Sequence, residues 1–150
     1  MPGVRTGSWS YDVEAPCAPG EALALLSDIT RQGELHPLII HVEELPARDG
    51  AVRSFAVTDQ LKLGPIPFRI TYSADTLSIT DSEVVTVARQ KPRTTIRNRT
   101  TVSAAADGTH VHVDVQLTAP TLLFPYAFRE GRKAHLALAD RIRQVLSTQG

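Results

Sequence analysis

Alternating apolar and polar side chains near the start of the chain indicate a strand with one buried face. The apolar residues at every second position are Trp9, Tyr11 and Val13, with polar residues between them. A period of two is typical of a half-buried strand. The pattern predicts a strand over residues 8–15.

Helical spacing follows this strand. Pro19 suits a first helical position, because its fixed φ fits the helix and its missing N–H would have had no partner there. The apolar spacing predicts a helix over residues 21–27 and a second, short helix over residues 31–35. His36-Pro37 ends the second helix, because a residue before proline avoids helical backbone angles.

Alternation returns in a long block of predicted strands, which are separated by proline and glycine turns. The six strands are Leu38–Leu45, Ala51–Leu63, Phe68–Leu77, Glu83–Arg89, Thr94–Ala104 and Thr109–Thr118. The turn between the second and third strands is Gly64-Pro65-Ile66-Pro67.

The last two strands form the clearest hairpin, because Asp107-Gly108 between alternating segments is a strong turn signal. Placing this pair at the tip sets Ala106 opposite Thr109. Three further pairs follow from that register: Val102 with Val113, Thr100 with Val115, and Asn98 with Leu117. Apolar and polar side chains then separate onto two faces.

The C-terminal segment predicts one long helix over residues 122–147. Spacings of four and three residues place one stripe on a single face, made of Phe124, Phe128, Gly131, His135, Leu138, Ile142 and Val145. The order of elements indicates a single α+β domain over residues 1–150. One amphipathic helix cannot cover a curved seven-stranded sheet completely, so the uncovered part becomes a cavity or a packed core.

Composition narrows the classes of protein. The 150 residues carry 16 Lys and Arg against 16 Asp and Glu, which disfavours a nucleic-acid binder. No apolar run approaches the roughly 18 residues of a membrane span, and the first ten residues do not resemble a signal peptide. Cys17 is the single cysteine and lacks a visible activating arrangement, so we expect an inert thiol and a cytoplasmic protein.

Three segments together carry a resemblance to a known family. They are Tyr11-Asp12-Val13-Glu14-Ala15-Pro16, the helix from Ala18 to Asp28, and His36-Pro37 at the start of a strand. With the long C-terminal helix, the chain resembles the START-like (SRPBCC) superfamily, specifically bacterial polyketide cyclase/dehydrase and lipid-transport proteins. The resemblance implies a helix-grip fold, in which the sheet wraps the C-terminal helix around a pocket for apolar ligands. Leu35 stands where members often have Trp before the His-Pro step.

Residues on the inward face are the candidate ligand-binding residues. They are Phe55, Phe68, Tyr72, Asn98, Thr100, Phe124, Phe128, Gly131 and His135. His135 is the best candidate for catalysis, since imidazole titrates near neutral pH, but a histidine bonded within the core fits the pattern as well. Asn98 needs a hydrogen-bond partner if it is buried, and Tyr72, Thr100 or a ligand could supply one.

Metal ligands and cofactors are not expected. His110 and His112 share the polar outer face, as His two apart on a strand do, but a metal site needs three or four convergent ligands. No sequence argument joins them to the other pair, His36 and His41. A basic run is typical of a solvated strand surface, and binding of an acidic ligand, a carrier protein or a membrane headgroup remains the alternative. The run consists of Arg89, Lys91, Arg93, Arg97 and Arg99.

Three hypotheses about function remain open at this point. The first is binding of a small hydrophobic or amphipathic molecule, such as a polyketide, a lipid or an aromatic metabolite. The second is an aromatase/cyclase or dehydratase in which His135 or Tyr72 moves a proton. The third is a protein-interaction module with a filled core. The sequence also leaves a homodimer open.

Overall fold

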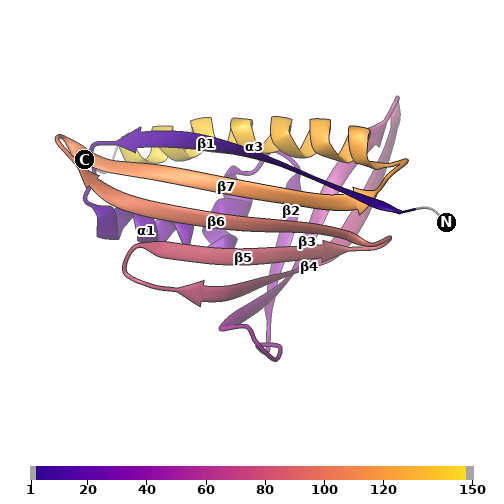
Figure 1. The fold of residues 1–150 in the computed structure, drawn as a ribbon, viewed down its shortest axis with the longest axis horizontal. Coiled ribbons are helices and arrows are strands. Elements are labelled where there is room, and N and C mark those ends of the chain that lie inside the picture. The colour runs from indigo at the N-terminus through magenta and orange to yellow at the C-terminus, as the bar shows by residue number, and fades with distance from the viewer. Residues whose placement is uncertain (1–2, 148–150) are drawn as a thin grey trace.

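One antiparallel sheet and one long helix dominate the computed structural model, which describes residues 3–147 (Figure 1). The strands are β1 (Val4–Ala15), β2 (Ile39–Leu45), β3 (Arg53–Leu63), β4 (Ile66–Ile79), β5 (Glu83–Gln90), β6 (Thr94–Ala105) and β7 (Gly108–Pro120). The helices are α1 (Pro19–Leu26), α2 (Ile29–Leu35) and α3 (Phe124–Ser147). The seven strands lie in the order β1-β7-β6-β5-β4-β3-β2. This is the predicted α+β helix-grip fold.

Local chemistry explains where the helices begin. Pro19 opens α1, as predicted. The second helix starts two residues before the predicted Arg31, because the Asp28 carboxylate accepts the backbone N–H groups of Thr30 and Arg31 at 3.1 and 3.3 Å. This cap gives two helix-start donors a partner. The long helix begins at Phe124, two residues after the predicted start.

The β3–β4 turn is shorter than the sequence predicts. Gly64 and Pro65 alone separate the strands, so Ile66 and Pro67 belong to β4 and pair with Leu63 and Lys62. Gly64 has a φ of 62°, in the left-handed region that glycine adopts most easily. The four-residue turn predicted over Gly64-Pro65-Ile66-Pro67 is therefore not formed.

The predicted register of the β6–β7 hairpin is wrong by two residues. Val102 lies opposite Val111, Thr100 opposite Val113, and Asn98 opposite Val115. The turn is Ala106-Asp107, and Gly108 already pairs with Ala105 as the first residue of β7. At that point Gly108 passes so close to the carbonyl oxygen of Ala15 that a Cβ would clash. A shift of two preserves the faces, so the inward set is unchanged.

The core is divided into two clusters of buried side chains. The larger one joins β1, β6 and β7 to α1 and α3, and it includes Trp9, Val113 and Leu138. The smaller one centres on Phe55, with Val57 and Ala74, on β3 and β4. The long helix packs mainly on β1 and β7, so the β3–β5 part of the sheet is less covered. Within residues 3–147, no helix is long and apolar enough to cross a membrane.

Candidate functional site

A cavity of about 190 Å³ lies between the sheet and α3, where the two core clusters meet. Its walls come from α2 and the segment after it, from β2 to β6, and from α3. The lining residues are Ile29, Gln32, His36, Leu38, Ile39, Val57, Asp59, Tyr72, Ala74, Thr86, Ala88, Gln90, Thr94, Ile96, Asn98, Gly131, Ala134, His135 and Leu138. Apolar groups make up most of the surface that faces the space, although nine of the nineteen lining residues carry a polar group.

An aspartate and a tyrosine form the first polar pair in this cavity. The Tyr72 hydroxyl donates a hydrogen bond to Asp59 Oδ1 at 3.2 Å, from the neighbouring strand. Burial raises the pKa of Asp59 to about 6, and the hydrogen bond from Tyr72 partly opposes that rise. Burial also raises the pKa of Tyr72, so its hydroxyl stays protonated. The Asp59 carboxyl can therefore gain or lose a proton near neutral pH.

Two histidines form the second polar group. The rings of His36 and His135 are nearly perpendicular, with centroids 6.2 Å apart. Burial lowers the pKa of His135 to about 4; burial, with a smaller contribution from His135, lowers that of His36 to about 3. Both rings are therefore neutral near pH 7. His36 Nδ1 accepts the backbone N–H of Leu38 at 3.1 Å, which leaves its Nε2 as the protonated nitrogen.

The His135 ring has one unsatisfied atom. Its Nδ1 is fully buried and has no hydrogen-bond partner among residues 3–147. The rings of Trp9 and Tyr11 flank the His135 ring, and their centroids lie 5.6 and 6.4 Å from its centroid. A buried polar atom without a partner costs free energy.

Asn98 and Thr100 lie side by side on β6. The Thr100 hydroxyl donates to Asn98 Oδ1 at 3.1 Å, so the partner that the sequence suggested for Asn98 exists within the strand. Asn98 lines the cavity, whereas Thr100 is buried and does not. The amide NH₂ of Asn98 remains as a donor.

The other candidate residues lie in different places. Gly131 lines the cavity, and a Cβ there would lie 3.4 Å from the Trp9 ring, so the glycine also allows close packing on β1. Phe55 is fully buried in the smaller cluster, and Phe68 is half-buried on β4 outside the lining. Phe124 and Phe128 stack on each other at 5.3 Å and cover Gly7. Phe55, Phe124 and Phe128 therefore shape the core rather than the cavity wall, and Phe68 belongs to neither core cluster.

Sequence reasoning missed Asp59 and gave His36 only a minor role. Asp59 shares its strand face with Phe55 and Val57, both buried, so a carboxyl group at an inward position was the available signal. His36 ends α2, and only the packing of α2 beside α3 brings its ring to His135. The basic run behaves as expected of a strand surface at two positions, where Arg89 pairs with Asp75 and Arg99 with Glu83.

Comparison with known proteins supports the fold. No protein-family model matches the sequence, and no curated protein matches it either. Among solved structures, the di-domain ARO/CYC StfQ of the steffimycin biosynthetic pathway is similar, with a TM-score of 0.75 and 11% identity over 96% of this chain and 52% of that one. The chain thus corresponds to about half of StfQ.

Two further solved structures are similar over nearly their whole length. A norcoclaurine synthase of Thalictrum, solved with a transition-state analogue, has a TM-score of 0.67 and 12% identity over 97% of both chains. Ara h 8.0201 has a TM-score of 0.63 and 14% identity, over 93% of this chain and 98% of that one. At such identities the likeness shows the fold alone.

Proposed function

We propose that the protein binds a small, mainly apolar molecule that carries a hydroxyl or carbonyl group, in the cavity between the sheet and α3. The observation that carries this proposal is the cavity itself, a mainly apolar space with the neutral His135 ring in its wall. Asn98 and the Asp59–Tyr72 pair offer further polar contacts.

The size of the cavity favours one part of the predicted ligand range. An apolar cavity of about 150 Å³ accommodates benzene. The present 190 Å³ therefore suits one or two fused rings better than a long lipid chain or a multi-ring polyketide. An interaction module with a filled core would not be expected to contain such a space. ARO/CYC proteins and Ara h 8.0201 share the fold, which adds general support to a ligand-binding or cyclase role.

Isothermal titration calorimetry with 2-naphthol tests the proposal, because this probe combines two fused rings with one hydroxyl. We expect one molecule to bind per chain. Ala88→Phe adds a ring inside the cavity and should weaken binding at least about 10-fold, a loss of about 1.4 kcal/mol. The matched control is Ala56→Phe, on the opposite face of the sheet, which should bind as wild type does. Equal affinity in Ala88→Phe, or no binding to wild type, would contradict the proposal.

A second candidate function is proton removal next to a ligand carbonyl, the first step of an aldol-type cyclisation. The Asp59–Tyr72 pair favours it, because a carboxyl with a pKa of about 6 is a suitable base at neutral pH. Asp59 would take the proton from carbon. The Tyr72 hydroxyl, released from the carboxylate as that charge is neutralised, would then donate to the oxygen that becomes negative. His135, with its lowered pKa, is too weak a base for this step, so the proton-transfer role proposed for it from the sequence moves to Asp59.

Hydrogen–deuterium exchange of 2-tetralone in D₂O, followed by NMR, tests this second function. Wild-type protein should accelerate exchange of the protons next to the carbonyl. Asp59→Asn should remove most of that acceleration, since a general base contributes about 10²–10⁴-fold. Exchange at the buffer rate in the presence of wild-type protein would exclude this chemistry for 2-tetralone while leaving the binding proposal intact.

A further inference from the structure

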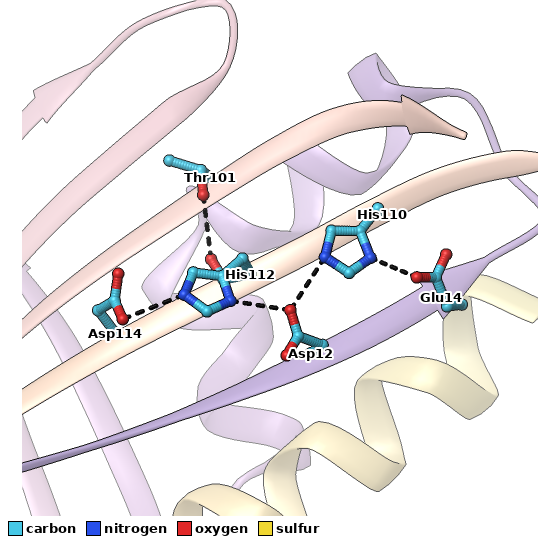
Figure 2. Close-up of polar contacts among 6 residues, drawn as sticks. All are labelled: Asp12, Glu14, Thr101, His110, His112 and Asp114. Carbon is cyan, nitrogen blue, oxygen red and sulfur yellow. Dashed lines mark hydrogen bonds and ion pairs between the residues drawn. The ribbon is translucent and has the colours of Figure 1, made fainter.

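The outer face of the β1–β7 pair carries a compact group of histidines and carboxylates (Figure 2). Asp12 lies opposite His112, and Glu14 lies opposite His110, in the antiparallel register of the two strands. Their neighbours in sequence, such as Val13 and Val111, point to the core. The alternation of the two strands therefore holds the polar group together on the solvent side.

A single carboxylate oxygen sits between the two imidazole rings. Asp12 Oδ1 lies 2.9 Å from His110 Nε2 and 2.8 Å from His112 Nδ1. One ligand atom from each of the three residues lies within 4.8 Å of the others. In a tetrahedral zinc site with bonds of about 2.0–2.1 Å, ligand atoms are roughly 3.3–3.4 Å apart. Small side-chain movements would thus admit an ion.

Two outer carboxylates orient the rings, and this is an observation independent of the distances to Asp12. His110 Nδ1 contacts the Glu14 carboxylate, and His112 Nε2 lies 3.1 Å from Asp114 Oδ1. Each ring thus has one nitrogen on an outer carboxylate and the other directed toward Asp12, as Figure 2 shows. This carboxylate–histidine arrangement is how metal-binding histidines are commonly held.

We propose that Asp12, His110 and His112 form a surface site for Zn²⁺ or a similar divalent transition-metal ion. Two imidazoles and one carboxylate are a donor set that suits zinc, whereas Mg²⁺ and Ca²⁺ prefer oxygen donors alone. The rings bind the ion as neutral groups, so the protons that they share with Asp12 go to solvent. Three protein ligands leave one position for water.

The proposed ion would link the edge strand β1 to its only partner strand. Among the described strands, β1 pairs with β7 alone. Asp12 and His112 are 100 residues apart in the chain, so the ion would connect two distant segments. Binding to the folded state alone would raise its thermal stability.

Calorimetric titration with zinc chloride tests the site, on full-length protein that carries no affinity tag and has been treated with a chelator. We expect one Zn²⁺ per chain. His112→Ala and Asp12→Asn should each weaken binding at least about 10-fold, and Glu14→Gln about 10-fold by releasing the His110 ring. The matched control is His41→Ala, an exposed histidine on β2, which should bind as wild type does.

A second readout separates this site from loss of structure. Circular dichroism should show that the variants remain folded without zinc, because all three side chains are on the surface. Zinc should raise the melting temperature of wild type and His41→Ala but not that of His112→Ala. Absence of one-to-one binding, or equal affinity in wild type and His112→Ala, would overturn the proposal.

Discussion

The two faces of the sheet place the same residue type in opposite environments. His36 and His135 lie beside the cavity, where burial lowers their pKa to about 3 and about 4. His110 and His112 lie on the outer face, where hydrogen bonds to carboxylates raise their pKa. Desolvation disfavours the charged ring on the inside, and nearby negative charge favours it on the outside.

This contrast separates two kinds of chemistry. Neutral imidazoles in the wall of a mainly apolar cavity can form hydrogen bonds with a neutral ligand. The outer rings sit among three carboxylates, which attract a cation. The inner face is therefore suited to small organic molecules, and the outer face to metal ions.

The largest effect that this contrast predicts is a loss of stability in acid, caused by protonation of His135. Unfolded histidine takes up a proton near pH 6.5, whereas folded His135 does so only near pH 4. Wild type should lose up to about 3 kcal/mol of stability from this group as pH falls from 6.5 to 4. The His135→Gln variant has no imidazole to protonate. Its free energy of unfolding, measured by urea denaturation, should therefore depend less on pH.

Other titratable groups in the same cavity also affect the measured pH dependence of stability. Protonation of His36 also destabilises the fold as pH falls, as protonation of His135 does. Protonation of Asp59 has the opposite effect, and Tyr72 stays protonated throughout. NMR titration of the five histidines gives the direct check. Titration of His135 above pH 6 would show that the cavity does not shield its ring.

A somewhat smaller effect is expected for Asp59→Asn. The folded pKa of about 6 lies above the reference value of 3.8, so ionised Asp59 weakens the fold. Its stabilising contribution is complete below pH 3.8 and is lost as pH rises through 6. Asn should therefore be more stable than wild type by about 2–3 kcal/mol at pH 8, with the difference vanishing near pH 4.

Urea denaturation at the two pH values measures this difference. Asp49→Asn is the control, because Asp49 is exposed in a turn and its replacement should change stability by no more than about 0.5 kcal/mol. A wild type that is more stable than Asp59→Asn at pH 8 would mean that the carboxylate is stabilised in the cavity rather than penalised.

The smallest predicted effect is the difference between two threonine hydrogen bonds, one on each face of the sheet. Thr100→Val removes the hydroxyl that bonds to Asn98 inside, leaving Asn98 Oδ1 without that donor, and should cost about 1–2 kcal/mol. Thr58→Val removes an exposed hydroxyl pair with Thr71 on the outer face, at 3.0 Å, and should cost less than about 0.5 kcal/mol. Equal losses in chemical denaturation would show that the two faces do not differ in this respect.

Much of the candidate cavity was predictable from periodicity. Tyr72, Asn98, Gly131 and His135 were placed on the inward face by strand alternation and helical spacing, and all four line the cavity. Phe124 and Phe128 have the same spacing, yet they cover Gly7 instead. Periodicity identifies a face, but it does not say which part of that face is open.

The hairpin register is a second feature that periodicity alone does not determine. A slip of two residues preserves the apolar and polar faces, so alternation alone cannot detect it. The close approach of Gly108 to Ala15 belongs to the contact between β7 and the end of β1, and no local pattern reports it.

The sequence by itself determined the order of the elements and the inward face of most of them, and its resemblance to a known family implied the helix-grip arrangement. Side-chain chemistry and backbone preferences act over a few residues and are visible in a short window. The tertiary structure alone decided which polar groups meet: Asp59 with Tyr72, His36 with His135, and Asp12 with His110 and His112. Those meetings depend on strand register and helix docking between distant segments, which no local pattern encodes.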